Sequence, residues 1–142
     1  MKRKVTVTVF LLLILTAANF NITAQMYWNN ACQFEGNNLS YLGKGNSSTL
    51  NITGSFTIEM WINPVNSTNP STQTLLQKRE GSNPTGYTLY LSTGRVALRT
   101  NSSTRLIGNI VIPNNTWSHI AGRYNSVNGQ FAIHVNGMLE LH

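Results

Sequence analysis

The ten residues from Ser55 to Pro64 constrain the fold of this chain more than any other stretch. Apolar side chains take every second position in it, namely Phe56, Ile58, Met60 and Ile62. A period of two is typical of a strand that packs one face on a core. Pro64 has no amide hydrogen and therefore ends the strand. The second face carries Trp61 between Glu59 and Asn63, an unusual composition for a purely solvated face.

Short strand-like runs continue along the rest of the chain, with Gly, Pro, Asn and Ser between them. We expect strands near residues 31–34, 39–42, 56–63, 74–78, 87–91, 95–99, 105–112, 117–124, 131–135 and 138–141. Asn136-Gly137 is the strongest hairpin signal, because both residues tolerate a positive φ. The run at 105–112 is less regular, since Gly108 interrupts it. The pattern predicts one all-β domain, a sandwich or barrel, over residues 27–142.

The N-terminus carries the pattern of a secretory signal peptide. Lys2, Arg3 and Lys4 precede an apolar run over residues 5–18, and the small residue Ala24 follows. The run is shorter than the roughly 20 apolar residues that cross a membrane. We therefore expect residues 1–24 to be a signal peptide and the protein to be secreted, extracellular or on the cell surface. An uncleaved N-terminal anchor is the alternative, and no later run suggests a stable membrane span.

Charge and cysteine content exclude some classes of protein. The chain has ten Lys and Arg against four acidic residues, a net charge of +6. Three of the basic residues lie in the predicted signal peptide, and the other seven are scattered, so no nucleic-acid footprint is predicted. Cys32 is the only cysteine and cannot form an internal disulfide. We expect it to be a small buried hydrophobe on the first strand.

Six segments follow one another along the chain in a fixed order: residues 31–36 (ACQFEG), 56–64 (FTIEMWINP), 75–78 (LLQK), 86–91 (GYTLYL), 116–124 (TWSHIAGRY) and 135–137 (VNG). In this order and spacing, they resemble the laminin-G-like, concanavalin A-like lectin/glucanase superfamily. The resemblance implies an antiparallel jelly-roll β-sandwich. It also implies a module that binds glycans or proteins, commonly beside other domains of a longer secreted or surface chain.

The resemblance implies further strands after the Asn136-Gly137 hairpin, where this sequence has only a few residues. On this ground we expect an incomplete sandwich, the N-terminal portion of the domain. The inner side chains of residues 56–62 and 131–135 would then be partly open, and some sheet edges would be unpaired.

Acidic residues are too few for the hydrolytic chemistry of this superfamily. The chain has no Asp, and its four Glu are Glu35, Glu59, Glu80 and Glu140. Glycosidases use two carboxylates that flank one bond. The resemblance implies that hydrolytic members carry acids two residues apart on one strand, whereas Glu59 has Thr57 and Trp61 there. We predict no enzyme, with Glu59 as a structural or rim carboxylate; a hydrolase whose acids lie in further sequence is the remote alternative.

The same scarcity of carboxylates argues against metals. Calcium takes six to eight oxygen ligands, usually with several carboxylates, and laminin-G-like domains often hold it. We predict no cofactor within these residues, and calcium only if further sequence supplies ligands. The histidines do not form a metal set: His119 is expected to pack near Trp117, and His134 to face solvent.

Trp61, with Glu59 and Asn63, is the candidate ligand site, because an aromatic plate beside hydrogen-bonding groups suits a sugar. Burial of Trp61 in the core is the alternative. The predicted function is a secreted, non-catalytic module that binds carbohydrate or an extracellular protein. A structural or adhesive role is the second reading. Six sequons would be glycan sites in a eukaryotic secreted protein, at Asn38, Asn46, Asn51, Asn66, Asn101 and Asn114.

Overall fold

The computed structural model describes residues 25–26, 31–36, 40–80, 83–100 and 104–140. The chain divides into two compact units, residues 1–46 and residues 47–142. The predicted signal peptide, residues 1–24, lies outside the described residues. The prediction of one domain over residues 27–142 stays a prediction.

The first unit contains one small pair of strands. β1 (Gln25–Met26) pairs antiparallel with β2 (Cys32–Gln33). Cys32 is exposed, so the prediction that it is buried is wrong. Two-residue strands cover too little surface to bury a side chain on either face. Residues 40–42 form no strand, contrary to the prediction for 39–42, and Tyr41 and Leu42 are both exposed.

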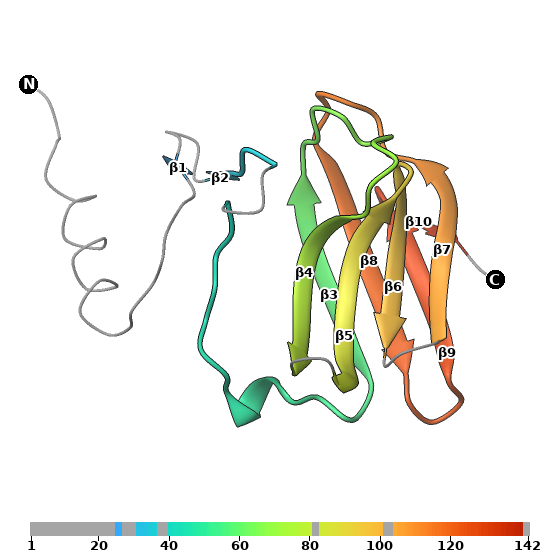
Figure 1. Ribbon diagram of the computed structural model, residues 1–142. Coiled ribbons are helices and arrows are strands. Elements are labelled where there is room, and N and C mark those ends of the chain that lie inside the picture. Colours follow the sequence, from blue (N-terminus) through green and yellow to red (C-terminus); the bar gives the residue numbers. More distant parts are fainter. Residues whose placement is uncertain (1–24, 27–30, 37–39, 81–82, 101–103, 141–142) are drawn as a thin grey trace, which may run out of the picture. The chain divides into compact units, whose positions relative to one another are not determined.

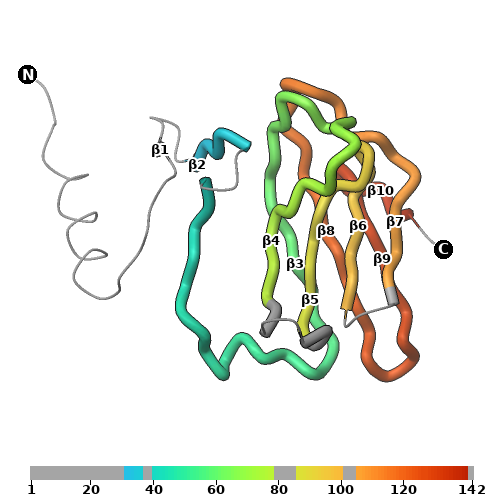
Figure 2. The backbone as a smooth tube through the Cα atoms, in the orientation of Figure 1, coloured from blue at the N-terminus to red at the C-terminus, as the bar shows by residue number. Residues whose placement is uncertain are grey.

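The second unit is a sandwich of two four-stranded antiparallel sheets, shown as two layers in Figures 1 and 2. The first sheet has the order β10-β9-β8-β3, and the second has the order β4-β5-β6-β7. The first consists of β3 (Phe56–Ile62), β8 (Ser118–Asn125), β9 (Gln130–Val135) and β10 (Met138–Glu140). The second consists of β4 (Gln73–Glu80), β5 (Asn83–Ser92), β6 (Arg95–Thr100) and β7 (Thr104–Val111). A short 3-10 helix, η1 (Ser48–Leu50), precedes β3. The predicted all-β sandwich is confirmed.

Two-residue turns close two of the hairpins. Thr93 and Gly94 join β5 to β6 with φ of 47° and 84°, and Asn136 and Gly137 join β9 to β10 with φ of 49° and 80°. Two consecutive positive φ values are the requirement of a type I′ turn, whose twist matches that of the flanking strands. The Asn136-Gly137 hairpin is therefore confirmed. Gly94 meets a further requirement, since a Cβ there would lie 3.0 Å from Cγ1 of Val111.

The core lies between the two sheets and is aliphatic. Its largest fully buried side chains are Leu89, Leu91, Leu98, Ile112, Ile120, Ile133, Val96 and Val135. Rings of Tyr87, Phe56, Tyr124 and Phe131 follow one another at centroid distances of 5.0, 5.8 and 5.0 Å across both sheets.

The inner face of β3 differs from the centre of this core. Its four apolar side chains are half-buried, as predicted for residues 56–62. The matching prediction for residues 131–135 is wrong at Ile133 and Val135, which are 0% and 1% exposed. The difference follows from position: β9 lies between two strands of its sheet, whereas β3 lies at the end.

Gly108 marks a bulge in β7. Between paired positions, β7 carries Gly108, Asn109 and Ile110 where β6 carries Val96 alone. The extra residues turn the Asn109 and Ile110 amides toward the carboxylate of Glu140 on β10, and both amides donate to its Oε2. A Cβ at Gly108 would lie 2.7 Å from that oxygen, so a larger residue here would displace the carboxylate. Glu140 thus stands in for the ladder partners that the bulge removes.

Candidate functional site

The face of the first sheet that points away from the second sheet is called here the β3–β8 face. β3 places Thr57, Glu59 and Trp61 on it, because exposed and half-buried residues alternate strictly along this strand. The Trp61 side chain is 63% exposed. Trp61 is therefore not part of the core, which was the alternative reading of the sequence.

His119 on β8 supports Trp61 from the neighbouring strand. The register pairs Trp61 with His119, and their ring centroids lie 5.3 Å apart at an interplanar angle of 53°. His119 thus has a packing role, as predicted, but the ring it packs on is Trp61 and not the expected Trp117. Imidazole Nε2 of His119 lies 3.8 Å from Oε2 of Glu59, close enough to form an ion pair when the imidazole is protonated. Trp61, His119 and Glu59 therefore form one contiguous group.

The hairpin turn after β9 holds His119 in position. The His119 amide donates to Oδ1 of Asn136 at 2.9 Å, and the Asn136 amide donates to the His119 carbonyl at 2.8 Å. Asn136, whose φ is positive, thus bonds to the β8 backbone through both its side chain and its amide. The Asn136-Gly137 signal in the sequence therefore also fixes the backbone beneath the imidazole.

Asn63 and Trp117 lie beside this group without a described contact to it. Asn63 is exposed and follows β3, two residues beyond Trp61. Trp117 precedes β8 by one residue and is 52% exposed. Sequence reasoning named Trp61, Glu59 and Asn63 but left out His119 and Trp117 as site residues. The spacing of two between Trp117 and His119 was a signal in the sequence that both belong to one strand face. The pairing of β3 with β8, which brings His119 beside Trp61, could not be read from the sequence.

His134 and Leu139 complete the same face on β9 and β10. The register aligns Glu59, Ala121, His134 and Leu139 across the four strands. His134 is half-buried rather than facing open solvent, because the neighbouring strands flank it on both sides. Leu139 remains 48% exposed.

The residues present do not fit a calcium site. Within the described part of the chain, no three side chains of His, Cys, Asp or Glu come together as metal ligands. Glu59 lies on the β3–β8 face, while the Glu140 side chain is bound to the backbone of β7 inside the sandwich. Calcium needs several carboxylate oxygens at one point, and these two carboxylates are separated by the sheet.

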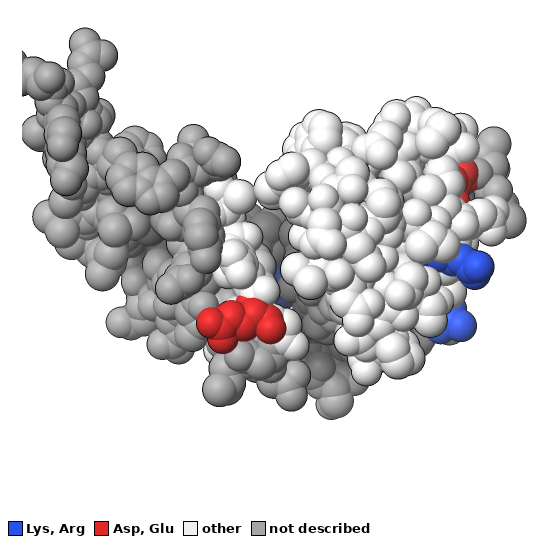
Figure 3. All heavy atoms as spheres, turned by 90° about the horizontal axis from the view of Figure 1, so that it is seen from above, with Lys and Arg blue, Asp and Glu red and all other residues white. Residues whose placement is uncertain are grey.

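Charged residues make up only 10% of this chain. Figure 3, which looks down on one end of the sandwich, shows mostly uncharged side chains on that end.

A model of the concanavalin A-like lectin/glucanases superfamily matches residues 34–141. The chain belongs to this superfamily. The match and the two antiparallel sheets confirm the resemblance seen in the sequence. A comparison with curated proteins gave no match.

Superfamily membership fits a binding module in general. Laminin-G-like domains are typically non-catalytic binding modules. In the part of the chain that the structure describes, no helix combines the length and apolarity that crossing a membrane requires.

Proposed function

We propose that this protein is a secreted module that binds carbohydrate on the β3–β8 face, with Trp61 as the platform. The observation that carries the proposal is the 63% exposure of an indole in a regular strand. Aromatic side chains are largely buried unless they serve a surface. An exposed indole supported from below offers a flat apolar plate for the C–H face of a sugar.

Hydrogen-bonding groups around the plate suit the hydroxyls of the same sugar. The Glu59 side chain is 68% exposed and accepts hydrogen bonds, and the His119 imidazole beside it is 30% exposed. The exposed Asn63, two residues beyond Trp61, offers both an amide donor and a carbonyl acceptor. The group thus combines apolar contact with donors and acceptors, as small polar ligands require.

A non-catalytic role is part of the proposal. Hydrolysis of a glycosidic bond uses two carboxylates that flank it. Beside Trp61 stands one carboxylate, Glu59, and its ion-pair partner is an imidazole. Glu140 lies on the opposite side of the same sheet, so it does not form a pair with Glu59 across one ligand.

A structural or adhesive role within a larger surface protein is the second candidate. The observation that favours it is the position of β3 at the end of its sheet, where no described strand pairs with its outer edge. Such edges pair readily with strands of other chains.

A glycan array probed with the secreted chain separates the two roles. We expect binding to a defined set of neutral glycans, lost in Trp61→Ala and reduced in His119→Ala. Leu139→Ala is the matched control, since Leu139 is an exposed apolar residue on the same face, two strands away from His119. Equal binding by Trp61→Ala and the parent would refute the platform and leave the structural role.

Calcium dependence is a separate test of the same proposal. Because the described residues offer no cluster of carboxylates, glycan binding is expected to be unchanged by EDTA. Loss of binding on chelation, restored by added calcium, would contradict this.

Secretion rests on the N-terminal pattern of basic and apolar residues. We expect the intact mass of the exported protein to match a chain that begins at Gln25. A mass that retains residues 1–24 would favour the anchor instead.

A further inference from the structure

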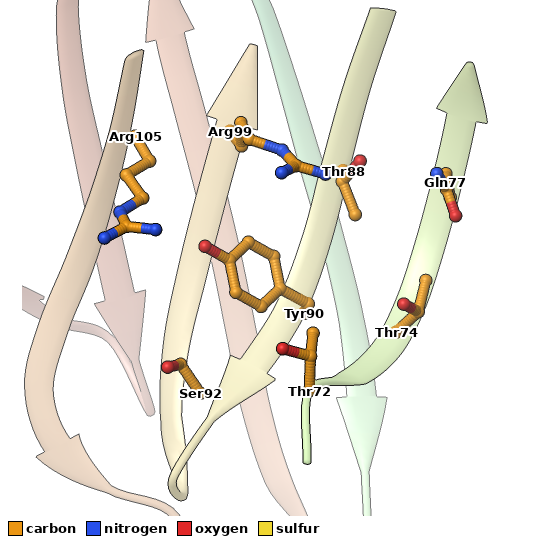
Figure 4. A pocket seen from close by; sticks show the side chains of 8 residues that line it. All are labelled: Thr72, Thr74, Gln77, Thr88, Tyr90, Ser92, Arg99 and Arg105. Atoms are coloured by element: carbon orange, nitrogen blue, oxygen red, sulfur yellow. The ribbon is translucent and has the colours of Figure 1, made fainter. Parts of the chain in front are cut away.

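The second sheet carries a polar hollow on its outer face, on the opposite side of the sandwich from Trp61. It has a volume of about 280 Å³ and is lined by side chains of β4, β5, β6 and β7. Two of its eight lining residues are the arginines Arg99 and Arg105, and none is acidic. Figure 4 shows these side chains on one side of the sheet.

Strand register explains how the hollow is assembled. Gln77 pairs with Thr88, Thr88 with Arg99, and Arg99 with Arg105, so one row crosses four neighbouring strands. Neighbouring strands are about 4.8 Å apart, which makes the row roughly 14 Å long. Its length suits an extended ligand lying across the strands better than a single small ion.

The next row gives the hollow its floor. Tyr90 on β5 pairs with Ala97 on β6, and the small Ala97 leaves space for the ring to lean across β6 (Figure 4). Arg99 leans the other way, from β6 over Thr88, and its guanidinium carbon lies 6.0 Å from the centre of the Tyr90 ring. These crossings leave Tyr90 only 6% and Thr88 only 3% exposed on an outer face.

The two arginines have a charge that nothing described in the protein neutralises. Their backbone positions lie opposite each other, but Arg99 leans away from β7, so the two guanidinium groups lie at separate points along the row. None of the described carboxylates forms an ion pair with either one. A carboxylate at either guanidinium would gain charge-assisted hydrogen bonds.

We propose that this hollow binds an acidic polysaccharide whose sugars carry carboxylates, with one carboxylate held by Arg99 and another by Arg105. The planar guanidinium matches a carboxylate through two parallel hydrogen bonds. On β4, the exposed Thr74 hydroxyl and Gln77 amide serve the sugar hydroxyls. This site is independent of Trp61, because the two lie on opposite faces of the sandwich.

The test is calorimetric titration of the full secreted chain with a galacturonic acid tetrasaccharide. The matched probe is the same tetrasaccharide with its carboxyl groups reduced to alcohols. We expect the acidic probe alone to bind, with an affinity that falls as salt is added. The side-chain Nε–H NMR signals of Arg99 and Arg105 are expected to shift during the titration. Equal binding of the reduced probe would overturn the proposal.

Substitutions locate the site and control for net charge. Arg105→Gln is expected to weaken binding by about tenfold, the effect of losing one charge-assisted hydrogen bond. Arg105→Lys, which keeps the charge but loses the planar fork, should fall between Arg105→Gln and the parent. Arg123→Gln removes the same charge from the exposed Arg123 of the other sheet and should change affinity by less than about twofold. Equal weakening by Arg123→Gln and Arg105→Gln would overturn the site.

Further probes fix the class of ligand. The preference for a sugar carboxylate would be overturned if inorganic phosphate or a sulfated neutral tetrasaccharide bound as tightly as the uronic acid. Tighter binding of a poly-glutamate peptide would overturn it too, and would point to a protein partner instead. Trp61→Ala is expected to leave uronic acid binding unchanged, so failure of one site does not count against the other. Because Arg105 is exposed, its variants are expected to melt like the parent. If Arg99→Gln, the variant at the other arginine, fails to fold, the binding of the Arg105 variants still decides the proposal.

Discussion

Trp61 shows at the scale of one residue how a ligand platform differs from a core aromatic. A buried Trp typically contributes about 3–5 kcal/mol to folding, as measured by truncation to Ala. With 63% of its side chain exposed, Trp61 gives up little buried surface on truncation. We expect Trp61→Ala to cost less than about 1 kcal/mol.

Thermal melting of Trp61→Ala beside Ile120→Ala checks this expectation. Ile120 is 0% exposed on the inner face of β8, so its truncation should cost about 2–5 kcal/mol. A loss at Trp61 as large as that at Ile120 would mean that the indole is covered in solution. The β3–β8 face would then lose its platform.

Sequence periodicity predicts the side of a strand but not what covers it. Alternation along residues 56–62 correctly put Trp61 and Glu59 opposite the aliphatic face. Whether Trp61 is exposed depends on what lies beside it. Its neighbour is His119 on β8, almost sixty residues further along the chain, and local periodicity does not contain that pairing. The pairing of Arg99 with Arg105 was unreadable for the same reason, because it depends on the register between β6 and β7.

At the scale of elements, the contact between Glu140 and the bulge of β7 explains an irregularity in the sequence. Gly108 interrupts an apolar run, and the structure shows why: the carboxylate of Glu140 fills the space where a Cβ would be. The carboxylate satisfies amides that the bulge turns away from β6. A buried carboxylate is costly unless it accepts such bonds, so each feature requires the other.

A double-mutant cycle tests this interdependence. Glu140→Ala removes the acceptor of the Ile110 amide and should cost about 1–3 kcal/mol. Gly108→Ala forces a methyl group against the carboxylate and should also cost about 1–3 kcal/mol. The double variant should lose less than the sum, because the methyl group then has no carboxylate to meet.

Urea unfolding of the four proteins gives the coupling free energy. Gly54→Ala is the control for introducing a methyl group, since no atom lies within 4 Å of a Cβ placed there. Strict additivity of the two substitutions would show that Glu140 and the bulge are stabilised separately.

Turn chemistry was the most predictable feature at this scale. Asn136-Gly137 has the residues that a type I′ turn demands, and the turn forms as expected. Residues 40–42 had strand-like composition but form no strand, so composition alone misled there. Strand formation needs a neighbour with matching register, which local sequence does not contain.

At the scale of the whole sandwich, the apolar side chains at the centre are fully buried, whereas those of β3 are only half-buried. β8 and β9 lie between other strands of the first sheet, whereas β3 ends it. This arrangement accounts for the fully buried Ile120, Ile133 and Val135 beside the half-buried side chains of β3. The two proposed binding surfaces lie outside this interior, so ligand binding on either face leaves the core undisturbed.

Hydrogen exchange of single amides tests this topology. Along an antiparallel strand, successive amides point alternately to the two neighbouring strands. In β8 both neighbours are present over residues 120–124, and in β5 over residues 87–91, so every amide of these stretches should be protected. In β3 only the amides that bond to β8 should be slow, and those facing the outer edge should exchange quickly, giving alternating protection across Phe56–Ile62. NMR-detected exchange resolves the two classes. Uniformly slow exchange along β3 would show that its outer edge is paired in solution, and would favour the structural role over glycan binding.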